Sequence, residues 1–546
     1  MSDAEFLAAR TEYWARALTA MPSVTGSADE ADFSATFAGL LKDSPAFAGR
    51  TDAVWQVAVP GGPFPRSCVL ALVRGTGRRT VILTGHFDTV ETGCYGDLEK
   101  LALLPDELGP ALIEAIGREP FDARSAKAHE DLLGGAFMAG RGLLDMKAGL
   151  AAGLAVCEAF ARDPGCHGNL LFIAVPDEEG NSAGARRIAE MLPEIAAEHG
   201  LDIEAAINLD ATVDDGDGEE GRAVALGTVG KLLPSALVVG RPAHASDSFR
   251  GFGAAALAGA LAAGMEWLPE LTERTGEELG AGPTLLGMKD DKTAYDVTTP
   301  ASVWMYWNVA LHRHSARDVL AALTDAAHHA ADELCAKLKT RSDAAGAGAA
   351  VGYVEVIDFN TILAEISVKD AKNAAIVADL AAKLAQSGLN LPEQCRRITE
   401  MVWALSGRQG PAIVTGFAST PYLATQLGDD PSGMRLAQAV GDAIEAISRD
   451  TGVSVRAIRY FPGISDVSFF GQADQSSIDD IAANTPSWPA VLGGAARFAT
   501  GGIPTINAGP WGRDYHTRLE RMHKGYCFDI LPRLLAGIVE RVLTQP

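Results

Sequence analysis

Imidazole and carboxylate side chains recur directly after the apolar stretches of this chain. His86 and Asp88 follow one such stretch, and the pair Glu178 and Glu179 follows another. Two further acids are Asp210, which follows a third apolar stretch, and Asp145, which lies at the expected start of a helix. Like charges placed together raise one another's pKa values unless cations neutralise them, so the pattern favours a pair of metal ions. Hard carboxylates with imidazole suit Zn, Mn or Co, and the absence of Cys among these residues excludes a zinc-finger type of site.

Each of these groups also has an ordinary explanation. A His-x-Asp sequence is common, Asp145 alone could cap a helix, and the pair Glu178 and Glu179 alone is typical of a solvated turn. The acidic loop of residues 214–221 (DDGDGEEG) is best explained as solvated surface. The combination favours the metal hypothesis, because several independent carboxylates follow apolar strands where neither water nor helix capping would demand them.

The expected elements explain how these side chains could meet. Strands and helices alternate along the first part of the chain, which predicts a doubly wound α/β domain with a mainly parallel sheet. The predicted strands are 53–59, 68–74, 80–84, 169–175 and 205–209, and the predicted helices are 3–20, 144–161 and 182–199. Open sheets of this class bind ligands beyond the carboxyl ends of their strands, where the acids and His86 lie.

The middle of the chain has a different pattern. After Gly230, a strand, an Ala-rich helix, a strand and a long helix follow at residues 232–239, 253–267, 303–312 and 316–338. This order predicts a smaller α+β two-layer domain with its helices on one face of the sheet. The expected domains are therefore a catalytic domain of residues 1–229 and 356–546, and an inserted domain of residues 230–355 that ends in an Ala- and Gly-rich linker. Residues 95–135 are expected to form an insertion of their own.

The composition limits the classes of partner. The 546 residues include 46 basic and 70 acidic side chains, which gives a net charge of −24. Nucleic acids and anionic membrane surfaces attract clustered Lys and Arg, so neither is expected as a partner. No apolar stretch of about 18 residues and no signal peptide is visible. The seven cysteines are scattered, odd in number and never in CxxC spacing, which favours reduced thiols in a cytoplasmic protein.

Four segments resemble the motifs of the M20 metallopeptidase and amidohydrolase family in their order and spacing. They are GHFDTV at 85–90, GRGLLDMKAG at 140–149, DEEGNSAG at 177–184 and GIPTINAGPWGRDYHTRLER at 502–521. Two further segments, YDVTTP at 295–300 and VWMYWN at 303–308, resemble the arginine-utilisation branch of that family, the RocB-type proteins, which are also unusually long. The resemblance implies a catalytic domain, an inserted lid and dimerisation domain, and a homodimer.

The resemblance also implies a metal site. It would hold two divalent ions, Zn above all, with Mn or Co as alternatives. In the family pattern Asp145 bridges both metals, His86 and Asp210 belong to the first metal, Glu179 completes the site of the second, and His516 is the distant last ligand.

Three further residues acquire catalytic roles from the same resemblance. Glu178 resembles the general base that activates a water molecule. Asp88 resembles the carboxylate that orients the imidazole of the ligand two residues before it. His244 resembles a histidine of the lid domain that stabilises the oxyanion, often across a dimer interface.

The implied reaction is hydrolysis of an amide bond in a small substrate, which could be an N-acyl amino acid, a dipeptide or an arginine-related compound. Family peptidases usually carry Asp-x-Arg at the end of a lid strand, and this Arg holds a substrate carboxylate. Here the comparable strand reads WNVALHR at 307–313, so the Arg is absent from its place. Asn308, Arg313 and Arg513 remain candidate substrate contacts. An Arg in the cleft would favour a peptidase, and an acyl pocket would favour a deacylase. The alternative is a non-catalytic metal-binding or ligand-binding protein that retains the family fold. Such a protein would not need the general base Glu178.

Overall fold

The computed structural model divides the chain into two compact units. The first comprises residues 1–228, 425–473 and 497–546, and the second comprises residues 229–424 and 474–496. The structure describes residues 2–118, 122–163, 165–275, 278–349, 351–461, 463, 465–471, 475–488 and 502–544.

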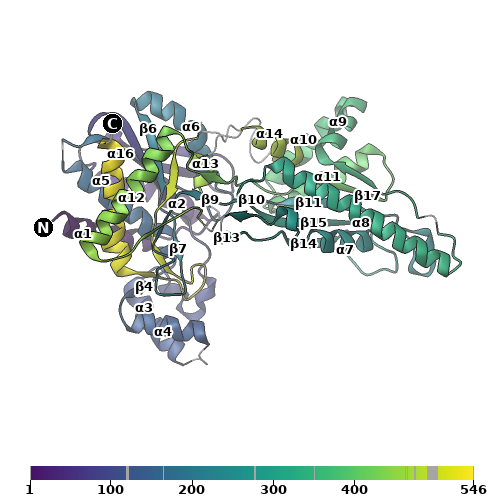
Figure 1. Ribbon diagram of the computed structural model, residues 1–546, viewed down its shortest axis with the longest axis horizontal. Helices are drawn as coiled ribbons and strands as arrows, with labels where there is room; N and C mark the ends of the chain where they lie inside the picture. Colours follow the sequence, from purple (N-terminus) through teal and green to yellow (C-terminus); the bar gives the residue numbers. More distant parts are fainter. Residues whose placement is uncertain are drawn as a thin grey trace. The chain divides into compact units, whose positions relative to one another are not determined.

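The first unit is built on an eight-stranded sheet with a parallel centre (Figure 1). The order across the sheet is β1 (Val54–Val59), β2 (Arg66–Arg74), β5 (His167–Val175), β3 (Thr76–His86), β6 (Asp202–Asn208), β20 (Thr505–Asn507), β8 (Ala223–Ala225) and β19 (Arg456–Ile458). Strand β3 pairs in parallel with β5 on one side and with β6 on the other, whereas β1 and β2 are antiparallel. The predicted α/β fold class is confirmed.

Helices cover both faces of this sheet. The principal ones are α1 (Asp3–Thr19), α2 (Ala28–Asp43), α5 (Ala148–Ala161), α6 (Ala183–His199), α12 (Pro431–Thr451) and α16 (Leu531–Thr544). Leu170 and Phe172 of β5 belong to the hydrophobic cluster that contains α5 and α16. The alternate residues Leu171 and Ile173 are equally buried but point to the opposite face, and α6 contacts the neighbouring strands β1 and β2. A sheet covered on both faces explains why its strands are continuous apolar runs.

The second unit is built on a six-stranded sheet with helices on both faces. Its strands are β10 (Gly230–Leu232), β15 (Ser302–Leu311), β11 (Pro234–Val239), β17 (Ala412–Phe417) and β16 (Glu355–Asp358), with β14 (Thr284–Asp290) paired to β15. Helices α7 (Ala254–Met265) and α8 (Ala316–Ala344) pack together. Helices α9 (Phe359–Lys369), α10 (Ala371–Ala385) and α11 (Leu391–Ser406) form a separate core with Leu237 and Trp304 of the sheet.

This second helical layer changes the domain boundary. The sequence placed the end of the inserted domain at residue 355, but the unit continues to Ala424. The reason is that β17 pairs with the whole length of β11, and β16 pairs in parallel with β17. The Ala- and Gly-rich segment expected as a linker, residues 342–352, therefore falls inside one unit, and its first residues belong to α8.

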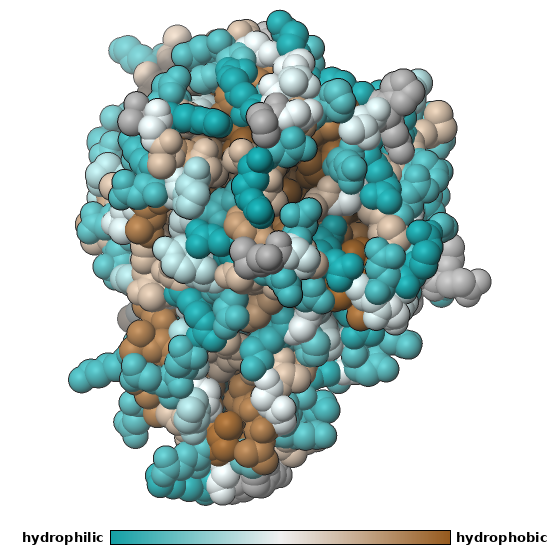
Figure 2. Space-filling model, turned by 90° about the vertical axis from the view of Figure 1, so that its left-hand side faces the viewer, coloured by the Kyte–Doolittle hydropathy of each residue, from teal (hydrophilic) through white to brown (hydrophobic). Residues whose placement is uncertain are grey.

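One face of the molecule is mostly polar. On the face shown in Figure 2, hydrophilic side chains predominate and hydrophobic ones lie in separate patches. Among the helices of the described residues, none combines the length and the apolar character that a membrane crossing requires.

Candidate metal centre

Three neighbouring strands of the first unit deliver side chains to one edge of the sheet. His86 ends β3 and lies opposite Val175, the last residue of β5, so the chain that follows β5 leaves at the same level. Thr84 of β3 pairs with Asn208, and Asp210 follows two residues later. Because the three strands are parallel, their carboxyl ends coincide, as expected for a ligand site in an open α/β sheet.

Asp145 reaches the same place from a non-helical segment. Helix α5 begins at Ala148, and Asp145 has extended backbone angles (φ −116°, ψ 96°) in the segment that precedes it. The sequence expected this residue inside the opening of a helix from residue 144, so that boundary was wrong. The ordinary explanation of Asp145 as a helix cap also fails, because Lys147 occupies the cap position and no side chain caps the helix.

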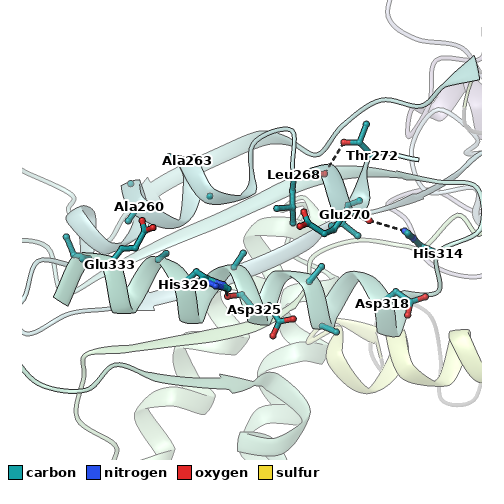
Figure 3. Close-up of a pocket in the computed structure, with 18 of the residues that line it drawn as sticks. Ala260, Ala263, Leu268, Glu270, Thr272, His314, Asp318, Asp325, His329 and Glu333 are labelled. Carbon is teal, nitrogen blue, oxygen red and sulfur yellow. Dashed lines mark hydrogen bonds between the residues drawn. The ribbon is translucent and has the colours of Figure 1, made fainter. Parts of the chain in front are cut away.

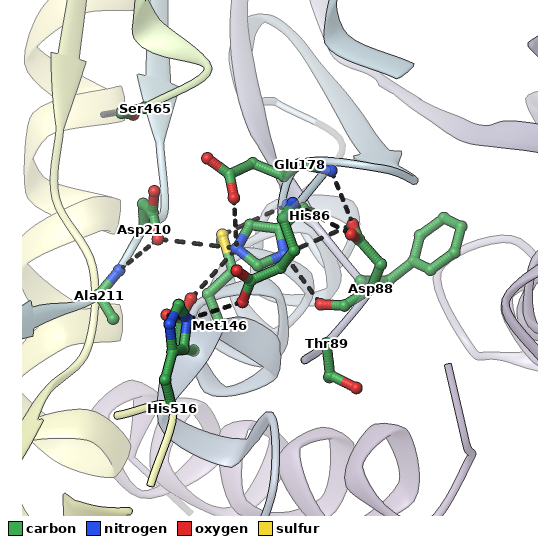
Figure 4. Close-up of polar contacts among 12 residues, drawn as sticks. His86, Asp88, Thr89, Met146, Glu178, Asp210, Ala211, Ser465 and His516 are labelled. Atoms are coloured by element: carbon green, nitrogen blue, oxygen red, sulfur yellow. Dashed lines mark hydrogen bonds and ion pairs between the residues drawn. The ribbon is translucent and has the colours of Figure 1, made fainter. Parts of the chain in front are cut away.

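The candidate ligands form two groups that share Asp145. Figure 4 shows His86, Asp210 and His516 gathered at this place, with Glu178 and Asp88 beside His86. In the first group, His86 Nε2 lies 3.1 Å from Asp145 Oδ1 and 3.8 Å from Asp210 Oδ1. In the second, His516 Nε2 lies 3.1 Å from Asp145 Oδ2 and 2.8 Å from Glu179 Oε1. One carboxylate oxygen of Asp145 therefore faces each group, which is the arrangement that a bridging ligand requires.

The donor chemistry of both groups fits a pair of divalent cations. Each offers one imidazole nitrogen and two carboxylate oxygens, a set that suits Zn, Mn or Co. Burial raises the pKa values of Glu179 and Asp210, so the site disfavours their negative charge without a cation. Burial lowers the pKa of His516, but hydrogen bonds with Asp145 and Glu179 outweigh this and raise the pKa to about 10. Without a metal ion, the protonated imidazole of His516 thus balances the negative charges of Asp145 and Glu179, and a bound metal ion would take over this role.

Glu178 lies beside the first group without belonging to it. Its Oε2 atom is 3.9 Å from His86 Nε2, and its side chain is about one-eighth exposed (12%). Burial raises the pKa of Glu178 well above its ordinary value, opposed by the charge of His86 and reinforced by Asp210 and Glu179. A carboxylate with a raised pKa at the edge of a cation site is suited to accept and release a proton.

Asp88 fixes both His86 and the segment that carries the two glutamates. His86 Nδ1 donates to the main-chain carbonyl of Asp88 at 3.0 Å, while the carboxylate of Asp88 is 3.6 Å away. That carboxylate accepts the backbone N–H groups of Glu178 (3.1 Å) and Glu179 (3.2 Å) and the hydroxyl of Thr25 (2.8 Å). The carbonyl of Asp88 therefore orients the imidazole, and its carboxylate holds the turn after β5.

A buried ion pair supports the same turn and was not predicted from the sequence. Asp177 adopts a left-handed backbone conformation (φ 72°), and its carboxylate accepts from Arg66 Nη1 at 2.5 Å and from the N–H of Ala183 at 3.1 Å. Arg66 also lies 3.6 Å from Glu30, a fully buried acid whose pKa burial raises to about 7. No local pattern marks Arg66, because its partner lies 111 residues away.

Asn507 and Asp466 are two further polar residues near the site that the sequence reasoning missed. Asn507 accepts the backbone N–H of Asp210 at 3.2 Å and donates to its carbonyl at 2.9 Å, and so fixes this ligand from β20. Asp466 is only 1% exposed. Burial raises the pKa of Asp466 to about 7, although the charge of His86 and the Ser182 side chain oppose this.

Arg513 has a structural environment that conflicts with the proposed substrate contact. It lies in β21 (Trp511–Arg513) and is 4% exposed. Its guanidinium pairs with Asp131 at 2.6 Å and donates to the main-chain carbonyls of Asp214 (3.1 Å) and Gly216. Each of its three guanidinium nitrogens therefore has a partner inside the unit. The prediction that Arg513 contacts the substrate is corrected: it is a structural residue.

The remaining candidates belong to the second unit. His244 is exposed, and its Nδ1 accepts from the N–H of Ser246 at 3.2 Å. Asn308 is half-buried on β15 and pairs with Thr284 of β14. Arg313 donates to the carbonyl of Arg274 at 3.2 Å.

Arg313 lies at a cavity of about 1530 Å³ between α7 and α8. Alanine side chains of both helices line this cavity, and polar residues such as Glu270 and His314 surround it (Figure 3). The structure therefore brings Glu178, Asp88 and all five predicted ligands together in the first unit. The other three candidates, His244, Asn308 and Arg313, lie in the second unit.

Comparisons with known proteins agree with this geometry. The profile described as peptidase family M20/M25/M40 matches residues 82–478. Two proteins of Bacillus subtilis, YqjN and RocB, are each 28% identical to this chain, and the alignments cover 96% and 97% of it and 94% of each relative. The crystal structure of aminopeptidase PepT from Bacillus cereus has a similar fold, with a TM-score of 0.52 at 15% identity over 98% of both chains. The family match spans most of the chain and the relatives span nearly all of it, so the chain belongs to peptidase family M20/M25/M40 and is a hydrolase of its RocB-type branch.

Proposed function

We propose that this protein hydrolyses an amide bond in a small substrate with the help of two divalent metal ions. The observation that carries the proposal is the pair of ligand groups that share Asp145, with Glu178 beside them. His86 and Asp210 would hold one ion, Glu179 and His516 the other, and Asp145 both. When bound, such ions lower the pKa of a shared water molecule and polarise the scissile carbonyl.

Glu178 acts as the general base and then as the general acid. Its carboxylate takes one proton from the attacking water and later gives that proton to the leaving nitrogen, so the carboxylate is regenerated in each turnover. The position of Glu178 supports this role, because its Oε2 atom lies 3.9 Å from His86 Nε2, at the edge of the first ligand group. Asp88 supports it indirectly by holding the backbone of Glu178.

His244 is proposed to stabilise the oxyanion. Its Nδ1 accepts a hydrogen bond from the backbone N–H of Ser246, which leaves Nε2 as the ring nitrogen that can donate. Similarity to the family supports a homodimer with a lid formed by the second unit, and seven unpaired cysteines support a cytoplasmic location.

The substrate class depends on whether a cationic side chain in the cleft holds a carboxylate group of the substrate, and on which side chain this is. With Arg513 engaged in the interior, Arg313 and Asn308 are the proposed substrate contacts of the second unit. N-acyl amino acids and dipeptides are the first compounds to test, and the motif resemblance to the arginine-utilisation branch adds arginine-related compounds. Zinc is the proposed metal, with Mn and Co as alternatives.

The rival proposal is a protein that binds metal or ligand without catalysis. The two are separated by assaying hydrolysis of N-acyl amino acids and dipeptides with Zn, Mn or Co, in the wild type and in Glu178→Gln. Hydrolysis that the substitution abolishes supports the enzyme. Metal binding without hydrolysis of any compound in the panel supports the rival.

A further inference from the structure

The insertion between β3 and β4 (Phe137–Ala139) contacts the loop that carries His516. This insertion contains α3 (Pro105–Gly117) and α4 (Ala123–Leu133), and the loop joins β21 to β22 (Arg521–His523). Strand β4 pairs with β22, so the insertion ends beside the strand that follows the loop. The catalytic chemistry assigns no role to α4, yet two of its charged side chains are directed at this loop.

Asp131 of α4 is the first of these side chains. It is 7% exposed, and a single carboxylate oxygen accepts from Arg513 Nη1 at 2.6 Å and from Arg521 Nε and Nη2 at 2.9 and 2.8 Å. Arg513 and Arg521 are the residues at the two ends of the loop. Asp131 thus joins the strands from which the loop departs, by charge-assisted hydrogen bonds.

Arg124 of α4 is the second. Its guanidinium forms an ion pair with Asp514, whose other oxygen accepts from Arg521 Nη1 at 2.5 Å. The side chain of Arg124 is 60% exposed, whereas that of Asp514 is 3% exposed. Arg124 therefore covers the buried carboxylate of Asp514 on its solvent side, two residues before His516.

The loop needs such support because its backbone is strained. Asp514 and His516 both have left-handed conformations, with φ 57° and 62°. Such conformations persist in non-glycine residues only where the surroundings enforce them. The end of the loop is also fixed, since the buried Arg141 pairs with Glu520 and donates to the carbonyl of Thr517 at 3.4 Å.

We propose that α4 is a brace for the loop 514–520, in which Arg124 and Asp131 are positioning residues that hold His516 at the second metal group. The inference rests on the proposed function, because it assigns His516 to a metal. The same brace gives the insertion a role in the site, although neither candidate ligand group includes one of its described residues.

The test compares metal binding by the full-length wild type and by Arg124→Gln, Arg124→Lys and Asp131→Asn. Arg118→Gln is the matched control, since Arg118 is an exposed residue directly after α3 that pairs with Glu114 one turn earlier. Zn²⁺ is titrated into metal-free protein in competition with a chromogenic chelator, and the affinities of the two sites are fitted separately. Far-UV circular dichroism checks the fold.

Arg124→Gln and Asp131→Asn are expected to weaken one of the two sites by about 10–100-fold and to leave the other unchanged. Arg124→Lys should recover part of the loss, and Arg118→Gln should match the wild type. Two unchanged affinities in Arg124→Gln would overturn the brace, and this exposed residue decides the matter even if Asp131→Asn does not fold. A wild type that binds no metal would instead overturn the proposed function, and the brace with it.

Discussion

Replacing Glu178 with Gln removes the proposed base and changes little else. The two side chains have nearly the same size and shape, and Glu178 belongs to neither ligand group. Its backbone N–H still donates to Asp88, so the turn after β5 should keep its conformation. The amide has no oxygen basic enough to take a proton from water.

The expected loss follows from the role of the residue. A general acid–base group contributes about 10²–10⁴-fold to the rate, which corresponds to about 2.7–5.4 kcal/mol in the activation barrier. We therefore expect kcat of Glu178→Gln to fall by this factor while the metal content stays at the wild-type value. Metal-free protein should in addition become more thermostable, because burial disfavours the charged carboxylate that the substitution removes.

The assay is steady-state hydrolysis of the best substrate, with metal content measured by elemental analysis on the same samples. Glu190→Gln is the control, since Glu190 lies on α6 in an exposed pair with Arg187. A Glu178→Gln enzyme with wild-type kcat would refute the assignment of the base. Loss of metal together with activity would show that Glu178 acts as a ligand.

Three other perturbations test the account elsewhere. The folded-state pKa of His516 is about 10, above the ordinary value of 6.5. Protonation of His516 therefore stabilises the metal-free protein fully below about pH 6.5, and this stabilisation is lost as the pH rises from 6.5 through 10. Zn²⁺ affinity should accordingly rise up to about tenfold per pH unit in that window, which titrations at several pH values would check, and His516→Ala should weaken binding and flatten the dependence. Arg66→Met leaves the buried carboxylate of Asp177 without its cation and should lower the free energy of unfolding by about 3–5 kcal/mol in urea denaturation, whereas an unchanged midpoint would contradict the role of this ion pair. Arg513→Ala should lower Tm through loss of its pair with Asp131, and a raised KM at unchanged Tm would restore it as a substrate contact.

The part of the site that follows strand ends could be predicted from the sequence. His86, Asp210 and the pair Glu178 and Glu179 each come directly after an apolar run, and parallel strands necessarily end at one edge. His516 has no such local signal, since it lies in a loop with left-handed backbone, and only the motif resemblance identified it.

Residues that act across long sequence distances were missed. Asn507 fixes Asp210 from 297 residues away, and Arg66 reaches Asp177 from a neighbouring strand. The end of the second unit was misplaced for the same reason, because the pairing of β17 with β11 joins segments that are far apart in the chain. An Ala- and Gly-rich segment was a plausible linker, and its local composition carries no information on that pairing.

The central claim is a two-metal centre that shares Asp145, and the most direct measurement is the metal content of the purified protein after reconstitution with Zn, Mn or Co. The account predicts about two equivalents per chain in the wild type and fewer in Glu179→Ala, whose side chain belongs to one group. No bound metal after reconstitution, or equal content in both proteins, would contradict it.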